Sequence, residues 1–339
     1  MTGEAAGGPL FIVGFPRSGT TLMRALLSAH PTIAIAPETH FLNRFAKGVE
    51  ALDLRTAANF QSFWGKFSRS DRFVELGIDA DRTKEGIVAT GDFHLRNVFA
   101  LTLQEFARAA GKPRWGEKTP AHDRHIGTLL EWFPDARVIY MVRDPRAACA
   151  SLLQAPWRTN PGSKSGNAKP GRVRRLRLLN EDSHFWRRSV ERYRRDWQHD
   201  PRVTAVRYEE LASHPEQSLR TVCRFIGAAY DPQMLVNRSA DDLPPARAHW
   251  GNEEHEQWRH AHIERARQGV SNESVAKWKG QLTPLEVAVV EANCHSRMPA
   301  LGYEPGADES RARRWRSRLF RGMVSVVLWR ENAFVKSLG

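Results

Sequence analysis

The sequence predicts an α/β fold in which a parallel sheet is flanked by helices on both faces. The first observation is a compact apolar run, Leu10–Gly14, followed by a glycine-containing loop and by apolar residues at helical spacing. The second is the apolar run Arg137–Val142, the strongest strand signal in the chain. The third is the alternation of strand-like and helix-like segments, which is typical of parallel sheets.

Five strands and the helices between them are expected in chain order. Short apolar runs predict strands at 10–14, 32–36, 137–142 and 203–207, and residues 114–118 are expected to form a strand end that runs into Thr119-Pro120. Apolar residues at helical spacing predict helices that begin near residues 21 and 40, cover most of 52–110, and then occupy 122–133, 145–153, 178–197, 209–226 and 284–294. Within 52–110, the expected packing groups are Phe60, Trp64, Phe67 and Phe73. No internal repeat interrupts this order.

The remaining stretches set the expected domain organisation. Residues 158–175 are rich in Pro, Gly, Ser, Lys and Arg, which predicts a mobile loop. Residues 240–269 are polar and irregular. We therefore expect a flexible N-terminus at 1–9, one large domain at 10–305, and a basic helical tail at 306–339.

The composition is that of a globular protein with a strongly basic charge. Of 339 residues, 41% are hydrophobic and 26% charged, so the chain can bury a core, and the net charge of +13 favours anionic partners. The three cysteines are far apart and lack metal-ligand spacing, so we expect neither a disulfide framework nor a metal site. A reducing, cytoplasmic location follows from this usage. No run approaches the roughly 20 apolar residues that a membrane helix needs.

The loop after the first strand has the pattern of an anion-binding site. Residues 14–21 read Gly-Phe-Pro-Arg-Ser-Gly-Thr-Thr, with the glycine spacing of a P-loop, but Thr20 stands where the P-loop lysine belongs. Backbone N–H groups between a strand and a helix can surround an anion, and Arg17 adds a forked cation. The fold is therefore expected to be P-loop-like, whereas hydrolysis of a nucleoside triphosphate is disfavoured.

A second anion-binding signal follows the strand at 137–142. Arg143 is expected at the carboxyl edge of the sheet, where open α/β sheets bind ligands. Ser151 follows two helical turns later, so both side chains could contact one phosphate. The alternative is that Arg143 pairs with Asp144 or caps nearby carbonyl groups.

These two segments, with Pro37-Glu-Thr-His40 between them, resemble the family of sulfotransferases that use 3′-phosphoadenylyl sulfate (PAPS). The similarity is to the branch that contains the tyrosylprotein and many bacterial enzymes, and it runs in order from residue 10 to residue 278. It implies in-line transfer of a sulfuryl group from PAPS to a hydroxyl acceptor, release of 3′-phosphoadenosine 5′-phosphate (PAP), and no metal.

The resemblance also implies contacts to the nucleotide. Those implied for the 5′-phosphosulfate are Pro16, Arg17, Ser18, Gly19, Thr20 and Thr21. Arg143 and Ser151 match the family's two contacts to the 3′-phosphate. Tyr208 is expected near the adenine, and Lys277 and Trp278 lie in a segment that is expected to close over the nucleotide.

The catalytic groups follow from the same resemblance. Glu38 occupies the position of the catalytic base, and His40 is the reserve candidate because it lies two residues away. Lys118, in Gly-Glu-Lys-Thr-Pro at 116–120, is expected to contact the transferring sulfuryl group or the bridging oxygen. Arg17 completes the expected catalytic set.

Two other functions remain open at this point. One is a P-loop kinase or NTPase, which needs a loop lysine and an acidic magnesium ligand. The other is a non-enzymatic binder of nucleic acid or acidic membrane, suggested by Arg187, Arg188, Arg192, Arg194, Arg195 and the tail at 311–339. We expect no specific nucleic acid, and we regard peripheral membrane contact through the tail as an alternative. A hydroxyl-bearing small molecule, glycan, lipid or peptide all remain candidate acceptors.

Overall fold

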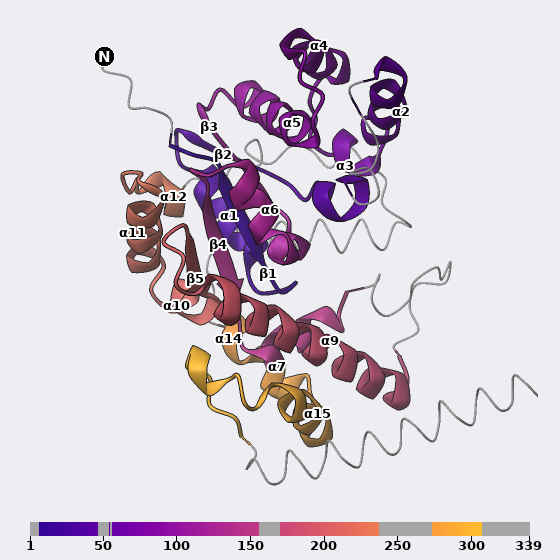
Figure 1. The fold of residues 1–339 in the computed structure, drawn as a ribbon. Coiled ribbons are helices and arrows are strands. Elements are labelled where there is room, and N and C mark those ends of the chain that lie inside the picture. Colours follow the sequence, from indigo (N-terminus) through magenta and orange to yellow (C-terminus); the bar gives the residue numbers. More distant parts are fainter. Residues whose placement is uncertain (1–6, 47–53, 55, 156–169, 237–272, 307–339) are drawn as a thin grey trace, which may run out of the picture.

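The centre of the molecule is a five-stranded parallel sheet. The computed structural model describes residues 7–46, 54, 56–155, 170–236 and 273–306. Its strands are β1 (Leu10–Gly14), β2 (Ile33–Ala36), β3 (Arg114–Lys118), β4 (Arg137–Val142) and β5 (Val203–Arg207). They lie in the order β2-β3-β1-β4-β5, and every neighbouring pair is parallel. The predicted α/β class and the five predicted strands are confirmed (Figure 1).

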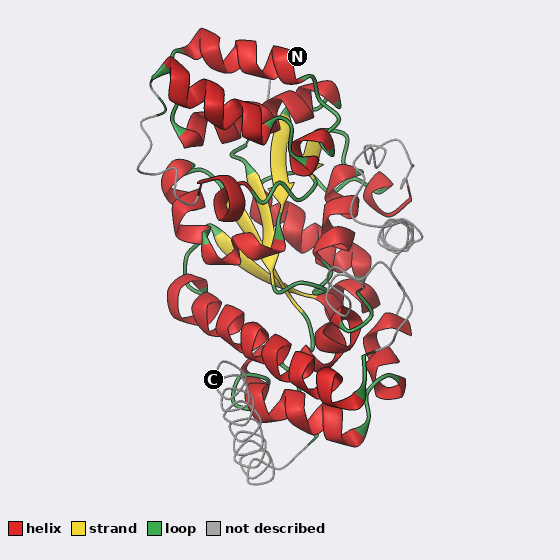
Figure 2. Ribbon diagram, turned by 90° about the vertical axis from the view of Figure 1, so that its right-hand side faces the viewer, coloured by secondary structure: helices red, strands yellow, loops and turns green. Residues whose placement is uncertain are grey.

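Helices cover both faces of this sheet (Figures 1 and 2). Successive side chains of a strand point to opposite faces, and in β1 they enter two different apolar clusters: Phe11 and Val13 join one, Leu10 and Ile12 the other. The first cluster includes side chains of α5 (Leu95–Ala109) and α6 (Ile126–Trp132), and the second includes side chains of α1 (Thr20–Ser28) and α11 (Pro215–Ile226). Burial on both faces explains why β1 and most of β4 are apolar.

A helical insert separates β2 from β3. Its elements are the π-helix η1 (Phe41–Ala46), α2 (Ala57–Phe67), α3 (Asp71–Val74), α4 (Ala80–Thr90) and α5. The four predicted packing groups are all buried. Trp64, Phe67 and Phe73 form edge contacts with one another, with the Phe67 and Phe73 centroids 5.2 Å apart, and Phe60 stacks on Trp64. The prediction of a mostly helical insert with an aromatic core is confirmed.

The later helices alternate with β3, β4 and β5. They are η2 (Pro120–Arg124), α7 (Pro145–Leu152), α9 (Arg172–Arg192), the π-helix η3 (Tyr193–Trp197), α10 (Tyr208–Ser213), α12 (Gln233–Val236), α14 (Glu273–Ala276), η5 (Lys277–Gly280), α15 (Pro284–Cys294) and η6 (Pro299–Leu301). α9 and α15 lie side by side in Figures 1 and 2.

Two predicted boundaries are wrong. The predicted loop at 158–175 overlaps α9, which begins at Arg172. The reason is a contact distant in sequence: Arg175 Nε donates to Glu286 Oε1 of α15 at 2.6 Å. The predicted helix at 209–226 is divided near His214, because Pro215 cannot continue the hydrogen bonding of α10 and instead starts α11.

Several predicted segments lie outside the described residues. They are 1–6 of the N-terminus, 158–169 of the loop, the stretch 240–269, and the tail from 307 onward. A search of the part of the chain that is described finds no helix long and apolar enough to span a bilayer.

Candidate active site

The loop between β1 and α1 has the backbone geometry of an anion site. Gly14, Arg17 and Gly19 have positive φ angles of 137°, 69° and 89°. Turns of this kind direct successive backbone N–H groups toward a common point. Gly19 is the N-cap of α1 and provides no side-chain cap, so the first N–H groups of this nine-residue helix face an anion site without a competing side chain.

Both residues predicted to bind the second phosphate contact this loop. Arg17 Nε donates to Ser151 Oγ at 3.1 Å, and Arg143 Nη1 donates to the Arg17 carbonyl oxygen at 3.1 Å. β1 and β4 are neighbouring parallel strands, so the segments that follow them leave the sheet at the same edge. The sheet therefore brings together two segments that are more than a hundred residues apart in sequence.

Arg143 is held in place by three groups. Besides the Arg17 carbonyl, its Nη2 donates to the Ser274 carbonyl oxygen at 2.6 Å, and its guanidinium carbon lies 4.1 Å from the centroid of the Tyr208 ring. Such a cation–π contact orients the guanidinium plane. Arg143 therefore does cap nearby carbonyl groups, as one alternative from the sequence predicted. Asp144, the other partner considered for Arg143, accepts a hydrogen bond from Arg146.

Tyr208 also limits what the loop can contain. A Cβ atom at Gly19 would lie 2.5 Å from Tyr208 Cδ2, closer than any real contact, and the φ of 89° at Gly19 disfavours a side chain as well. Glycine is therefore required here both by conformation and by space. The predicted position of Tyr208 near an adenine remains a prediction.

The donors around the loop fit a nucleotide that carries two anionic groups. Ser18 Oγ is buried and has no hydrogen-bond partner among the described residues, and the same holds for Arg143 Nε. Thr20 is buried and Thr21 half-buried in the first turn of α1. Two guanidinium groups, three hydroxyl groups of the loop and the Ser151 hydroxyl form a donor set suited to phosphate and sulfate oxygens.

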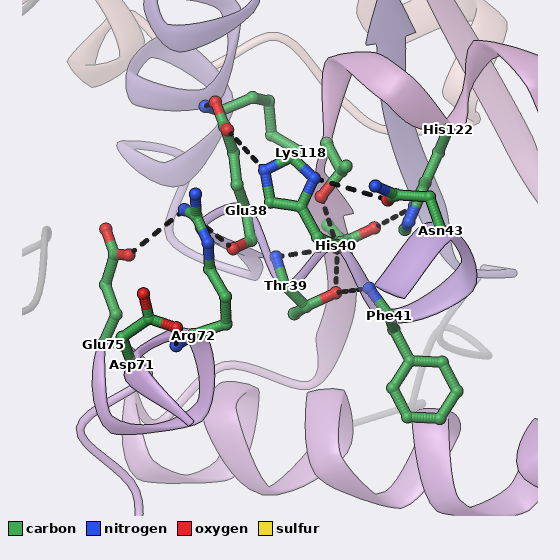
Figure 3. A network of polar contacts seen from close by, with 12 residues as sticks. Glu38, Thr39, His40, Phe41, Asn43, Asp71, Arg72, Glu75, Lys118 and His122 are labelled. Carbon is green, nitrogen blue, oxygen red and sulfur yellow. Dashed lines mark hydrogen bonds and ion pairs between the residues drawn. The ribbon is translucent and has the colours of Figure 1, made fainter. Parts of the chain in front are cut away.

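A second group of predicted residues meets at the ends of β2 and β3. Lys118 Nζ donates to Glu38 Oε1 at 2.5 Å, and His40 Nε2 lies 3.2 Å from Glu38 Oε2 (Figure 3). The Lys118 side chain is 6% exposed and that of Glu38 is 29% exposed. The three predicted catalytic residues other than Arg17 are therefore in direct contact.

The charges in this group act on one another. Burial would raise the pKa of Glu38, but the Lys118 ammonium, together with His40 and Arg72, holds that pKa well below its ordinary value. Burial lowers the pKa of Lys118 from its ordinary value, although Glu38 opposes this change. The free protein therefore favours an ionised Glu38.

Arg72 in α3 was not identified from the sequence. Its Nη1 donates to the backbone carbonyl of Glu38 at 3.4 Å and lies 3.6 Å from Glu75 Oε2 (Figure 3). The sequence contains no signal for this contact, because α3 is a single turn about 35 residues after Glu38 and only the packing of the insert brings it back.

Glu117 and His122 were also missed. Glu117 accepts hydrogen bonds from the backbone N–H of Thr39 at 3.1 Å and from both the Thr39 and Thr119 hydroxyl groups. His122 Nδ1 donates to Glu117 Oε2 at 2.9 Å, and both side chains are buried. Glu117 directly precedes Lys118, which is the one sequence signal that could have suggested a role.

The turn that carries Arg143 has its own supports. The backbone N–H of Asp144 donates to Glu209 Oε1 at 3.0 Å, and Glu209 Oε2 accepts from the Tyr303 hydroxyl at 2.8 Å. Arg146 makes ion pairs with Asp144 at 2.6 Å and with Glu291 at 2.8 Å. These contacts fix the end of β4 to β5 and to the C-terminal part of the domain.

Three predicted binding residues are less closely placed. Pro16 and Lys277 are exposed. The Arg146 guanidinium lies 4.4 Å from the centroid of the Trp278 ring, so this side chain packs on α7. The carbonyl group of Ser274 brings that segment to Arg143. Contact of Lys277 and Trp278 with a nucleotide stays a prediction.

The arginines that suggested a binder of nucleic acid or acidic membrane are in part paired within the chain. Three arginines of the basic helix face carboxylates of the same chain: Arg187 with Glu191 at 3.8 Å, Arg192 with Asp123 at 2.9 Å, and Arg195 with Asp196 at 2.7 Å. Among the described residues, no three or more His, Cys, Asp or Glu side chains are grouped to hold a metal ion.

Comparison with known sequences gives one family. The sequence model of the Sulfotransferase family matches residues 9–232. The chain is 27% identical over 317 residues to a protein-tyrosine sulfotransferase of Drosophila melanogaster, covering 88% of this chain and 52% of that protein. It is 27% identical over 318 residues to the nodulation protein NoeE of Sinorhizobium fredii, covering 89% of this chain and 67% of that protein. The chain thus spans about half the length of the fly relative.

Comparison with solved structures gives the same fold. The sulfotransferase domain from the curacin biosynthetic pathway superposes with a TM-score of 0.57 at 21% identity, covering 88% of this chain and 98% of that domain. The sulfotransferase domain of the Synechococcus PCC 7002 olefin synthase gives a TM-score of 0.53 at 20% identity, covering 86% and 96%. At such identities the likeness concerns the fold.

Proposed function

The chain belongs to the sulfotransferase family, and from this we propose that it transfers the sulfuryl group of PAPS to a hydroxyl acceptor, with Glu38 as the base. The predicted family and the predicted parallel α/β fold are confirmed. Sulfuryl transfer from PAPS is the general reaction of this family, which agrees with the predicted class of enzyme. The roles of individual residues are our proposal.

One observation carries the nucleotide site: Arg17 contacts both Ser151 and Arg143. The loop and the Arg143–Ser151 pair therefore form one continuous set of donors. We assign the loop N–H groups, Ser18, Thr20 and Thr21 to the 5′-phosphosulfate, and Arg143 with Ser151 to the 3′-phosphate. Arg17 lies between the two, where its charge stabilises both anionic groups.

In the proposed reaction the acceptor oxygen attacks sulfur as the bond from sulfur to the phosphate oxygen breaks. Glu38 Oε takes the hydroxyl proton, and PAP leaves with the electron pair of the broken bond. Fixed cations stabilise the charge on the peripheral and leaving oxygens, as in phosphoryl transfer. A positioned base contributes typically about 10²–10⁴-fold to the rate.

The contact between Lys118 and Glu38 gives Lys118 two successive partners. In the free protein its ammonium is the main charge that lowers the pKa of Glu38. When Lys118 turns to the leaving oxygen, Glu38 loses this contact, and its pKa rises toward a range better suited to accepting a proton. His40, at 3.2 Å from Glu38, stays as a hydrogen-bond partner that orients the carboxylate.

The acceptor is proposed as a hydroxyl compound, with small molecule, glycan, lipid and peptide as the classes to be tested. The fly relative is named as a protein-tyrosine sulfotransferase, which supports including a tyrosine peptide. We propose no specific nucleic-acid partner, since three of the basic-helix arginines are ion-paired. Cytoplasmic location and membrane contact through 311–339 stay predictions.

The test is incubation with ³⁵S-labelled PAPS and a panel of a tyrosine peptide, a simple phenol, a lipid alcohol and a glycan, read by mass spectrometry and label transfer. We expect label on at least one acceptor and stoichiometric PAP. Glu38→Gln serves as the matched control, because it keeps the size of the side chain. Transfer by the variant at the wild-type rate would remove Glu38 from the mechanism.

A further inference from the structure

The segment that carries Glu38 is fixed by a buried polar network outside the catalytic contacts. Thr39, which follows Glu38, donates its backbone N–H to Glu117 Oε1 at 3.1 Å, and its hydroxyl donates to the same oxygen. The Thr39 hydroxyl in turn accepts the backbone N–H of Phe41 at 3.1 Å. Figure 3 shows Thr39 between Glu38 and Phe41, with a dashed line from the Thr39 hydroxyl to the Phe41 nitrogen.

The backbone between these bonds is strained. His40 has a positive φ of 52°, which is uncommon for a residue other than glycine. Such a conformation persists only where its surroundings hold it. Here the residue before His40 and the two residues after it are each bound: Thr39 to Glu117, Phe41 to Thr39, and Leu42 to His122 Nε2 at 3.3 Å.

The tautomer of His122 follows from its two partners. A backbone N–H can only donate, so His122 Nε2 accepts from Leu42 and the ring proton lies on Nδ1. Nδ1–H then donates to Glu117 Oε2 at 2.9 Å. Glu117 Oε1 accepts from Thr39 and Thr119 as well, so every observed contact of this carboxylate is one in which it accepts a hydrogen bond.

We propose that Glu117 and His122 form a positioning pair that sets Glu38 against Lys118. Glu117 is covalently next to Lys118 on β3, and it holds the residue next to Glu38 through both the backbone N–H and the hydroxyl of Thr39. One buried carboxylate thus fixes both members of the 2.5 Å contact between Lys118 and Glu38. This assignment of a role in catalysis rests on the proposed function, whereas the positioning itself does not.

The test uses Thr39, because its hydroxyl can be removed without changing its shape. Thr39→Val loses both side-chain hydrogen bonds and Thr39→Ser keeps them. The measurement is the pKa of Glu38, followed by NMR of ¹³Cδ-labelled glutamate and assigned with Glu38→Gln. The charged groups facing Glu38 are Lys118 from β3, His40 from its own segment and Arg72 from α3, and none of them is altered.

In the wild type and in Thr39→Ser we expect a pKa well below the ordinary 4.5 of a glutamate. In Thr39→Val we expect it to rise toward 4.5, because the carboxylate moves away from Lys118. An unchanged pKa in folded Thr39→Val overturns the proposal. If that variant does not fold, Glu117→Gln is measured in its place, with the same expected rise and the same contradicting result.

Kinetics with the acceptor selected by the panel separate positioning from a purely structural role. We expect kcat of Thr39→Val to fall about 100-fold, since a displacement of about 1 Å can have such an effect. The Kd of this variant for PAP should stay within about twofold of the wild-type value. Thr39→Ser should restore kcat. A lower melting temperature with unchanged kcat contradicts the proposal. If the pKa of Glu38 rises as expected in Thr39→Val but the wild type transfers no sulfuryl group, the proposed function is overturned and the positioning of Glu38 still holds.

Discussion

Arg17 and Ser151 are 134 residues apart in sequence, and Arg17 Nε donates to Ser151 Oγ at 3.1 Å. The contact joins the loop after β1 to the helix after β4. Together with the bond from Arg143 to the Arg17 carbonyl, it makes one anion site out of two sequence motifs.

Glu38→Gln should lower kcat about 10²–10⁴-fold, the range that a positioned base contributes. The amide keeps the shape of the side chain but cannot take the proton of the acceptor. The Kd for PAP should stay within about twofold, since the loop and Arg143 are unaltered. The measurement is steady-state kinetics with isothermal titration of PAP, and a parallel loss of PAP binding would show that Glu38 serves the nucleotide site instead.

The pH dependence should differ between the free enzyme and the ternary complex. The carboxylate form of Glu38 is required, and its lowered pKa preserves that form as the pH falls, so the acid limb of kcat/KM for PAPS should lie below pH 4.5. The ammonium of Lys118 is lost as the pH rises through its lowered pKa, so the basic limb should lie below pH 10.5.

The acid limb of kcat itself should lie at higher pH than that of kcat/KM, because Lys118 has turned to the leaving oxygen in the complex. Samples returned from each pH to neutrality control for unfolding. Coinciding acid limbs would contradict the two successive partners of Lys118.

Gly19→Ala should abolish measurable PAP binding. The added Cβ would lie 2.5 Å from Tyr208 Cδ2 at a φ of 89°, so the loop or Tyr208 must move. Gly111→Ala is the matched control, because Gly111 also has a positive φ, of 67°, but has no atom within 4 Å of the added Cβ. We expect a lower melting temperature in both variants, but loss of PAP binding only in Gly19→Ala. Equal PAP affinity in the two variants would contradict the loop as the binding site.

Arg146→Leu should destabilise the fold by about 3–5 kcal/mol, the usual effect of removing one partner from a buried ion pair. Arg146 holds Asp144 at 2.6 Å and Glu291 at 2.8 Å, and all three side chains are largely buried. Arg177→Leu removes an exposed pair with Glu181 and should change stability by less than about 1 kcal/mol. Urea unfolding of both variants measures the difference, and equal effects would contradict the buried network.

The sequence was sufficient for the sheet because β1 and β4 are apolar on both faces and are bounded by glycine or proline. The sequence named Glu38, Lys118 and His40 only as separate catalytic candidates; their direct contact is seen in the structure, where β2 and β3 end at one edge of the sheet. The sequence did not reveal Arg72 or the start of α9, because both depend on contacts between segments distant in sequence: Arg72 with Glu38, and Arg175 with Glu286.

Glu117 illustrates a different limit of sequence analysis. A carboxylate next to a predicted catalytic lysine looks like a surface ion-pair partner, and only the structure shows it buried with Thr39, Thr119 and His122. The tautomer of His122 depends on the backbone N–H of Leu42. Such a hydrogen bond has no pattern in the sequence.

A calorimetric comparison of PAP with adenosine 5′-phosphate, on the wild-type protein and on Ser151→Ala, tests whether the loop after β1 and the Arg143–Ser151 pair bind one nucleotide together. If the loop and Arg143 with Ser151 form one site, PAP should bind the wild type at least about 100-fold more tightly, since charge-assisted hydrogen bonds contribute roughly 1.5–3 kcal/mol each. Ser151→Ala should reduce the ratio between the affinities for PAP and for adenosine 5′-phosphate. Equal affinity of the wild type for both nucleotides would contradict the claim that Arg143 and Ser151 bind the 3′-phosphate.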